Sequence, residues 1–265
     1  MGKTIKFEII GHILIIRDND NMETITEFAR KKMREYPSIK TVALQRTKVS
    51  GWQRVRDLEY LFGDKNFETI YKEHGCVFKL NPKEVFFTER LSGERLRLSK
   101  IVSKNEIILN CFAGVGPFSI VIAKFNPSAI VHSVELNPRA YHYLVQNITL
   151  NKCDNNVYAY LGDAFQLVPK LFKNSVDRVL LPLPAVADKA LLLGLSALRK
   201  SKGFIHWQVT ERINKNIDVN SVITKRIKQL LADSHVDVSY KIHRIRLIRS
   251  IAPRIGHFAV DIEFV

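Results

Sequence analysis

Short runs of alternating apolar and polar residues open the chain and predict a small module of strands around one helix. Apolar positions between Met22 and Tyr36 recur at the spacing of a helix that buries one face. The expected elements are strands within 1–20, a helix over 22–36, a strand over 41–44, and strands and turns over 48–63 and 69–80. We expect this α+β module to span residues 1–82, with the joint at Asn81-Pro82.

Beyond Glu84 the pattern changes to apolar strands that alternate with helices. The expected strands are 85–87, 107–110, 130–135, 157–161, 178–182, 203–207, 236–247 and 257–265. The expected helices are 88–98 (a helix or turn-helix), 117–125, 138–151, 165–171, 187–198 and 217–233. This alternation is typical of a mostly parallel, doubly wound α/β sheet over residues 83–265. The last two strands lack an intervening helix, which predicts an antiparallel hairpin at one edge.

Charge adds the first functional indication. The chain has 41 lysines and arginines against 26 acidic residues, a net charge of +15. Such an excess favours a polyanionic partner, in most cases a nucleic acid, although a basic proteome or a solvated basic surface remains the alternative. The positive charge is spread along the chain and forms no low-complexity tail, which favours a shaped basic surface.

No apolar run is long enough to span a bilayer, and the first residues have no signal-peptide pattern, so we expect a cytoplasmic protein. Three cysteines, Cys76, Cys111 and Cys153, lie far apart. They fit neither a zinc site nor a disulfide framework, and no metal is expected. Reduced, mostly buried thiols are the preferred interpretation.

A glycine turn follows the strand 107–110 and precedes the helix 117–125. Gly114 and Gly116 let a ligand approach the backbone there, as in α/β nucleotide-binding units. Alone, this signal is weak, because such turns occur in many α/β proteins. The spacing G-x-G, without the third glycine of G-x-G-x-x-G, makes a dinucleotide a poor first choice.

Two acidic residues end the next two strands. Glu135 follows the glycine turn by close to the ~20 residues that typically separate such a turn from an acid at the end of the second strand. A carboxylate in that position can accept from both hydroxyls of a ribose. Asp163 is placed to accept the amine of an adenine, or else to cap the following helix. An adenosine site without phosphate binding fits S-adenosylmethionine better than NAD or ATP. A surface acid remains the alternative for Glu135.

The fourth strand ends in Pro182-Leu183-Pro184, at the sheet edge where doubly wound folds bind ligands. Prolines fix the backbone and remove donors, so this segment predicts a rigid wall with free carbonyl oxygens. A purely structural turn is the alternative.

These motifs, taken in order, resemble the archaeal and eukaryotic tRNA guanosine-37 N1-methyltransferase family. The stretches that carry the resemblance are 51–59, 85–95, Phe112-Ala-Gly-Val-Gly-Pro-Phe-Ser, Val134-Glu-Leu-Asn-Pro, Asn147-x-x-x-Asn151, Leu180-Leu-Pro-Leu-Pro and Ser250-Ile-Ala-Pro-Arg254. The resemblance implies a Rossmann-like class I methyltransferase domain that uses S-adenosylmethionine, preceded by a small α+β module. Members often carry a further N-terminal tRNA-recognition domain, which a chain of this length is expected to lack.

The resemblance also implies roles for single residues. Glu135 corresponds to the ribose-binding acid and Asp163 to the adenine-contacting acid, while Phe112, Asn137, Leu183 and Pro184 are expected beside the same cofactor. Glu94 corresponds to the general base for N1 of guanine, flanked by Arg90 and Arg95. Arg54, and with less support Arg56, corresponds to an arginine that supports catalysis. Arg95, Arg56 and Arg254 are expected to contact RNA.

Elementary chemistry agrees, because methylation of N1 requires removal of its proton by a base, and an arginine near O6 would stabilise the developing negative charge. The structural alternative for Glu94 is an ion pair with Arg90 or Arg97 on one helix. Trp52, Phe86 and Phe87 could stack on a splayed base or belong to the core.

The fourth strand departs from the family pattern. Many members have Asn-x-Pro, with the asparagine at the guanine edge, whereas Pro182 occupies that position here. We therefore predict a monomeric enzyme that methylates N1 of guanosine 37 in the tRNA anticodon loop. The alternatives are a wyosine-pathway enzyme, which transfers an aminocarboxypropyl group or methylates a carbon of the tricyclic base at position 37, and a non-catalytic RNA-binding protein.

Overall fold

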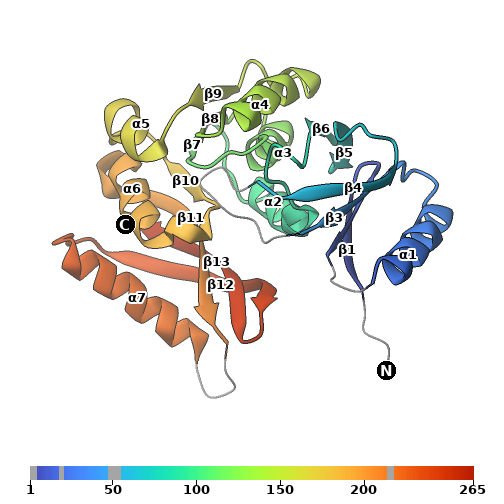
Figure 1. Cartoon of the computed structure of the whole chain (residues 1–265). Coiled ribbons are helices and arrows are strands. Elements are labelled where there is room, and N and C mark those ends of the chain that lie inside the picture. Colours follow the sequence, from blue (N-terminus) through green and yellow to red (C-terminus); the bar gives the residue numbers. More distant parts are fainter. Residues whose placement is uncertain (1–4, 18–20, 47–54, 214–217) are drawn as a thin grey trace.

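The N-terminal domain is a four-stranded sheet with one helix on its outer face. In the computed structural model, which describes residues 5–17, 21–46, 55–213 and 218–265, the strand order is β1-β2-β3-β4 (Figure 1). The elements are β1 Lys6–Ile10, β2 Ile13–Arg17, α1 Met22–Glu35, β3 Thr41–Gln45 and β4 Leu58–Gly63. α1 begins after Asn21, whose side chain accepts a hydrogen bond from the backbone N–H of Thr24 at 2.8 Å. Ile25 and Ala29 of α1 pack on one face of this sheet.

The second domain is a seven-stranded sheet in the order β12-β13-β11-β10-β7-β8-β9. Its strands are β7 Ile107–Asn110, β8 Ile130–Glu135, β9 Val157–Leu161, β10 Arg178–Leu181, β11 Gly203–Arg212, β12 Tyr240–Ala252 and β13 Ile255–Phe264. The five strands from β9 to β11 are parallel, while β13 is antiparallel to both of its neighbours. This confirms the predicted mostly parallel sheet with an antiparallel edge hairpin.

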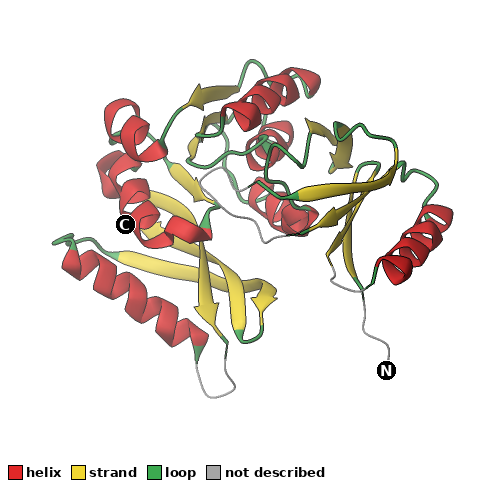
Figure 2. Ribbon diagram, viewed as in Figure 1, coloured by secondary structure: helices red, strands yellow, loops and turns green. Residues whose placement is uncertain are grey.

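Helices cover both faces of this sheet (Figure 2). They are α2 Ser92–Ser99, α3 Pro117–Phe125, α4 Pro138–Leu150, α5 Ala164–Leu171, α6 Ala187–Ala197 and α7 Val219–Asp233, with short 3-10 turns η1 Glu89–Leu91, η2 Pro184–Val186 and η3 Arg199–Ser201. Side chains of α2, α3 and α4 share one apolar core, and those of α5, α6 and α7 share another. Strand order reverses between β7 and β10, and the carboxyl ends of strands at such a point are where ligands bind.

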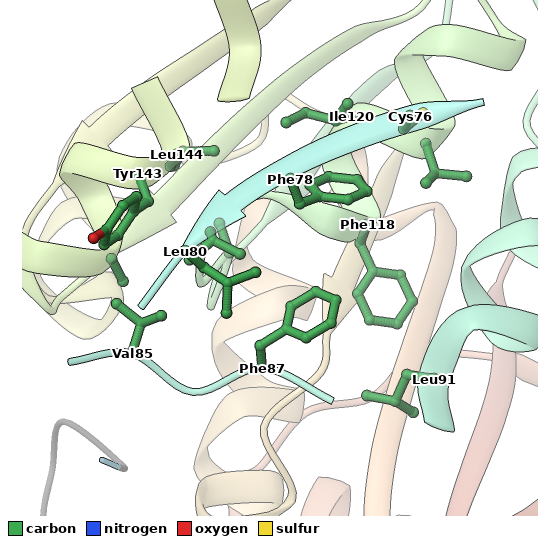
Figure 3. Close-up of a cluster of buried hydrophobic side chains, with 14 of the residues drawn as sticks. Cys76, Phe78, Leu80, Val85, Phe87, Leu91, Phe118, Ile120, Tyr143 and Leu144 are labelled. Carbon is green, nitrogen blue, oxygen red and sulfur yellow. The ribbon is translucent and has the colours of Figure 1, made fainter. Parts of the chain in front are cut away.

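The hairpin β5 Thr69–Glu73 and β6 Cys76–Leu80 joins the two domains. Its hydrogen bonds run to α4, where Asn147 accepts from the backbone N–H of Lys79 at 2.7 Å and Asn151 accepts from that of Val77 at 2.8 Å. Phe78 of β6 lies in the core (Figure 3). Since this hairpin packs on α4, we propose that the domain boundary falls between β4 and β5, earlier than the predicted residue 82.

Most predicted elements are present, with three differences. β12 runs over Tyr240–Ala252, whereas its predicted range is 236–247. Residues 85–87 form no strand but follow a turn in which the backbone oxygen of Asn81 accepts from the N–H groups of Glu84 and Val85. Val85 and Phe87 are nevertheless buried in the core between β6 and α2 (Figure 3). The apolar run over 85–87 therefore results from burial of these side chains and not from a β-strand. β11 continues to Arg212, five residues beyond its predicted end, because it pairs with β13 along its whole length.

All three cysteines are buried free thiols, as predicted. Burial raises the pKa of Cys76 to about 11. Within the described residues, no helix combines the length and apolarity needed to cross a membrane, and no group of three or more His, Cys, Asp or Glu side chains is placed to hold a metal ion.

Candidate cofactor and substrate site

A cavity of about 320 Å³ lies at the carboxyl ends of β7, β8, β9 and β10. Its walls come from the loops that follow these strands and from the segment before η1. The lining residues are Phe86, Cys111, Phe112, Gly114, Glu135, Leu136, Asn137, Ala140, Gly162, Asp163, Ala164, Phe165, Pro182, Leu183, Ala185 and Val186. The structure thus brings together seven of the residues predicted for this site: Phe112, Gly114, Glu135, Asn137, Asp163, Pro182 and Leu183.

The two glycines of the turn after β7 serve different purposes. Both have positive φ values, +58° at Gly114 and +93° at Gly116. A Cβ atom on Gly114 would meet nothing closer than the backbone oxygen of Phe86 at 3.9 Å, so this position is open to a ligand. A Cβ atom on Gly116 would lie 2.6 Å from Leu144 Cδ1. Gly116 therefore allows close packing of the turn and does not line the cavity.

Glu135 is held at the end of β8 by backbone donors. Its Oε2 accepts from the N–H of Gly114 at 2.7 Å, and its Oε1 accepts from the N–H of Asn137 at 2.8 Å. Burial raises the pKa of Glu135, although the backbone hydrogen bonds act in the opposite direction. The carboxylate is thus fixed beside the glycine turn, where the remaining lone pairs can accept from the two hydroxyls of a ribose.

Asp163 and Asn137 both cap helices at the rim of the cavity. Asp163 Oδ1 accepts from the N–H of Phe165 at 2.9 Å and begins α5. Asn137 accepts from the N–H of Arg139 at 2.9 Å and donates to the backbone oxygen of Glu84 at 3.0 Å. Asn137 therefore ties α4 to the segment before η1. The cap on α5 uses only Oδ1 of Asp163, so capping and adenine binding are compatible in this residue.

The wall after β10 is built largely as predicted. Pro182 and Leu183 line the cavity, while Pro184 begins η2 and does not line it. The opposite walls are apolar and include Phe112 and Phe165, whose ring centroids lie 6.2 Å apart. Sequence reasoning did not assign Phe165, Leu136, Ala140 or Val186 to the site. The available signal was their position in loops that already hold predicted residues: Leu136 and Ala140 follow Glu135, Phe165 follows Asp163, and Val186 follows Leu183.

Glu94 is buried and ion-paired on α2. Its two oxygens accept from Arg97 Nε at 2.9 Å and Arg97 Nη2 at 2.6 Å. A second cation, Arg246 on β12, lies 3.7 Å from Glu94 Oε2. Glu94 is not among the residues that line the cavity. The pair of Glu94 with Arg97, three residues later on the same helix, is the structural alternative that the sequence offers to a general base.

Arg56 and Arg95 are structural residues in this fold. Arg95 is 1% exposed and binds Glu73 of β5 with two nitrogens. Arg56 binds Glu8 of β1 and donates to the backbone oxygen of Phe87 at 2.6 Å. Burial lowers the pKa of Arg56 to about 10. The predicted RNA contacts of both residues are not supported, because buried, paired guanidiniums have no donors at the surface.

The other predicted arginines differ in placement. Arg54 and Trp52 lie outside the described residues. Arg90 is exposed on η1, with its Nε 3.7 Å from Glu89 Oε1. Arg254 is exposed in the turn between β12 and β13, with φ of +60°. Of the predicted stacking residues, Phe86 lines the cavity and Phe87 is buried in the core.

Comparison with known proteins agrees with this geometry. The model of the TRM5/TYW2 methyltransferase domain matches residues 69–243, and that of the TYW2 N-terminal domain matches residues 3–66. The chain belongs to the TRM5/TYW2 methyltransferase family. The two matched ranges meet between β4 and β5, in agreement with the boundary that we propose from the packing of the hairpin.

Relatives in this family carry different activities. The chain is 36% identical to the tRNA 4-demethylwyosine(37)-methyltransferase Taw21 of Saccharolobus solfataricus over 97% of its length and 93% of that protein. It is 33% identical to the tRNA (guanine(37)-N(1))-methyltransferase Trm5b of Pyrococcus abyssi, over 96% of this chain and 73% of that protein. It is 32% identical to a tRNA(Phe) (4-demethylwyosine(37)-C(7)) aminocarboxypropyltransferase of Methanocaldococcus jannaschii, covering 98% of both chains.

Solved structures of relatives contain the expected ligands. A complex of aTrm5 with tRNALeu matches 99% of this chain and 72% of that one, with a TM-score of 0.83 at 28% identity. TYW2 of M. jannaschii in complex with AdoMet matches 98% and 99%, with a TM-score of 0.72 at 29% identity. The predicted family, fold and cofactor are thereby confirmed.

The cavity of this TRM5/TYW2 chain fits S-adenosylmethionine on its own residues. Glu135 is a partly buried carboxylate fixed by backbone donors, Gly114 leaves room for a close approach, and apolar walls suit an adenine ring. Glu135 would hold the ribose hydroxyls and Asp163 the adenine amine. When bound, this cofactor supplies an electrophilic carbon for transfer.

Proposed function

We propose that this protein transfers the methyl group of S-adenosylmethionine to the base at position 37 in the anticodon loop of tRNA, and that the base is 4-demethylwyosine. The observation that carries the choice of base is the pairing of Glu94. N1 of guanine must lose a proton to a base as the methyl group arrives. Both oxygens of Glu94 already accept from Arg97, at 2.9 and 2.6 Å, so this carboxylate is engaged in an ion pair and is not free to take that proton.

A ring carbon of a tricyclic base imposes a different requirement. The ring carbon attacks the methyl group, the bond from methyl to sulfur breaks as the new bond to carbon forms, and the thioether is released; the ring proton then leaves to solvent. A strong base poised before transfer is therefore unnecessary. Pro182 supports this choice, since a proline lining the cavity has no side-chain amide for the guanine edge. The 36% identity to Taw21 over 97% of the chain supports it as well.

Methylation of guanosine 37 at N1 is the second candidate. It is favoured by Arg90 and Glu94, which stand in the family's order upstream of the glycine turn, and by the 33% identity to Trm5b of P. abyssi. In that case Glu94 would have to leave Arg97 when RNA binds.

The test compares two RNAs under the same conditions: an unmodified tRNA transcript and the same tRNA carrying 4-demethylwyosine at position 37. Each is incubated with S-adenosylmethionine labelled either in the methyl group or in the aminocarboxypropyl arm, and the nucleosides are identified by mass spectrometry. We expect a methyl group on 4-demethylwyosine. A methyl group on guanosine alone establishes the second candidate, and transfer of the arm or no transfer overturns both.

The variant Glu135→Ala is the matched control for this experiment. It removes the carboxylate that lines the cofactor cavity beside the glycine turn while leaving Glu94 and the basic surface in place. It should abolish transfer to either RNA.

A further inference from the structure

Four arginines from distant parts of the sequence gather where the N-terminal domain meets the methyltransferase domain. Arg17 ends β2, Arg56 precedes β4, Arg90 lies in η1 and Arg249 lies on β12. Glu8 connects the first two, since it binds Arg56 and lies 3.3 Å from Arg17 Nη2. Arg56 donates to the backbone of Phe87 shortly before η1, and η1 packs against β12. We call Arg17, Arg90 and Arg249 the arginine cluster.

Positive charge in this region exceeds the negative charge that neutralises it. Arg56 is buried and committed to Glu8, which Arg17 shares. Glu89 lies 3.7 Å from Arg90 Nε. Within the described part of the chain, Arg249 forms no ion pair. Four guanidiniums thus face two carboxylates.

The cluster also contains buried donors without acceptors. Nε of Arg17 and Nε of Arg249 are buried and have no hydrogen-bond partner among the described residues; one acceptor nearby, Oε2 of Glu89, is buried and unpartnered as well, so the donors still outnumber it. Burial, followed by the charge of Arg90, lowers the pKa of both side chains. Buried donors without partners are costly, so a built arrangement of this kind indicates a missing acceptor of negative charge.

Contacts through Arg56 connect the cluster to the cofactor cavity. The guanidinium of Arg56 is 5.9 Å from the ring centroid of Phe86, and Phe86 lines the cavity. Arg17 shares Glu8 with Arg56, so a series of direct contacts runs from Phe86 through Arg56 and Glu8 to Arg17. A nucleotide whose base points at the cavity would place backbone phosphates on this side.

We propose that Arg17, Arg90 and Arg249 bind one phosphodiester of the RNA backbone beside the nucleotide that is modified. The proposal rests on the proposed function, because the RNA is the tRNA anticodon loop. Guanidinium groups match phosphate oxygens in charge and in paired donor geometry. Buried Arg56 and Glu8 position Arg17 without touching the RNA. The N-terminal domain thereby contributes a ligand to a site that neither domain completes alone.

Binding of an anticodon stem-loop RNA, measured by fluorescence anisotropy over a range of salt concentrations, tests this site. Arg17→Gln and Arg249→Gln should each weaken binding by about tenfold and reduce the slope of log Kd against log salt by roughly 0.7. Arg199→Gln is the matched control, because Arg199 pairs with Asp177 at the amino-terminal edge of the sheet, away from the cavity. It removes the same charge and should leave affinity and slope close to those of the wild type.

A neutral phosphate identifies the contact from the RNA side. A series of stem-loops carries a single methylphosphonate at successive loop positions, and each is compared with the unmodified stem-loop. At one position the wild type should lose affinity, whereas the double variant R17Q/R249Q should bind the modified and unmodified stem-loops equally well. Equal losses in the wild type and in the double variant at every position overturn the phosphate site. If a glutamine variant fails to fold, Arg249→Lys keeps the charge, and it should preserve the salt slope while weakening binding.

The two proposals fail differently. If the wild type binds S-adenosylmethionine but no stem-loop RNA, the proposed function falls, and the phosphate site with it. If the wild type binds and modifies the RNA while R17Q and R249Q bind as R199Q does, only the phosphate site falls. Calorimetry with S-adenosylmethionine should give wild-type affinity for all three variants.

Discussion

Arg97 binds Glu94 and Asp261 with one guanidinium, donating to Glu94 at 2.9 and 2.6 Å and to Asp261 at 2.7 and 2.8 Å. Asp261 is also bonded to His206 Nδ1 at 2.6 Å, and Arg178 Nη1 lies 2.6 Å from His206 Nε2. Because arginine can only donate, His206 accepts at Nε2 and donates its Nδ1–H to Asp261. Burial lowers the pKa of His206, so it is neutral in this network. The network fixes α2 to β11 and β13.

Removing Arg97 should destabilise the protein more than removing a surface cation. Arg97→Gln leaves Glu94 and Asp261 buried without their shared partner, a change that typically costs about 3 kcal/mol or more. Urea unfolding at neutral pH measures this loss. The control is Arg46→Gln, which breaks the exposed pair with Glu59 and should have no measurable effect on the free energy of unfolding. Equal effects of the two variants would contradict the prediction.

Glu94→Gln tests the role of the carboxylate in transfer. Loss of a general base typically lowers turnover by about 10²- to 10⁴-fold. If Glu94 is a structural partner of Arg97, turnover on tRNA carrying 4-demethylwyosine should stay within about threefold of the wild type at a temperature where both are folded. Single-turnover kinetics with saturating cofactor gives the rate of transfer. A hundredfold loss on this RNA would show that Glu94 acts in the chemistry after all.

Asp261 should make the fold sensitive to acid. Burial alone would raise its pKa, but the hydrogen bonds from His206 and Arg97, together with the positive charge of Arg97, lower it to about 2 from 3.8. Because the unfolded chain takes up this proton first, stability is fully present above pH 4 and is lost as pH falls towards 2. The shift corresponds to about 2 kcal/mol. Unfolding free energies between pH 4.5 and 2 should therefore fall more steeply in the wild type than in Asp261→Asn, and parallel curves would refute this.

The strands and helices were predictable because each has a local signal. β7, β8 and β9 are short apolar runs, and each of the following helices begins at a cap or proline, as at Pro117 and Asp163. The carboxyl ends of parallel strands converge, so Gly114 and Glu135 could be placed together before the fold was known.

The roles of charged residues were less predictable, because partners come from elsewhere in the chain. Arg95 binds Glu73, 22 residues away, and Arg56 binds Glu8, 48 residues away. Both pairs depend on how the N-terminal domain and the β5–β6 hairpin pack, and no local pattern encodes that. The basic composition indicated nucleic acid correctly at the level of the family, but it could not separate surface arginines from buried ones.

The two glycines of the turn should respond differently to alanine. Gly116→Ala places a Cβ atom 2.6 Å from Leu144 and 3.0 Å from Ile120, with φ of +93°. We expect a loss of roughly 2 kcal/mol of stability from strain and overpacking. Gly114→Ala meets no atom closer than 3.9 Å, so its smaller cost comes from φ of +58° alone. Thermal unfolding without ligand compares the two, and a greater loss in Gly114→Ala would contradict this assignment.

Replacing Pro182 should change the preference for the base. Pro182→Asn introduces an amide at the end of β10, in a residue that lines the cavity. An amide can donate to and accept from a guanine edge, so methylation of unmodified transcript should rise relative to tRNA carrying 4-demethylwyosine, by about tenfold for one hydrogen bond. The ratio of kcat/KM for the two RNAs measures this change. Pro182→Ala, which has no amide side chain, is the control and should leave the ratio unchanged.

Glu135 should decide the affinity for the cofactor. Glu135→Gln keeps the shape of the side chain but replaces one acceptor oxygen by an NH₂ group. In the wild type, each carboxylate oxygen accepts from one backbone N–H, that of Gly114 or that of Asn137, so the new NH₂ group would face one of these donors. The variant loses a charge-assisted acceptor for the ribose and places a donor against a donor, so calorimetry should show S-adenosylmethionine binding weakened by about 10- to 100-fold. Asp163→Asn keeps a side-chain oxygen for the cap on α5, and it should weaken binding less. Binding of the stem-loop RNA should be unaffected in both variants, since neither residue belongs to the arginine cluster. Wild-type affinity in Glu135→Gln would remove the central acid from the cofactor site.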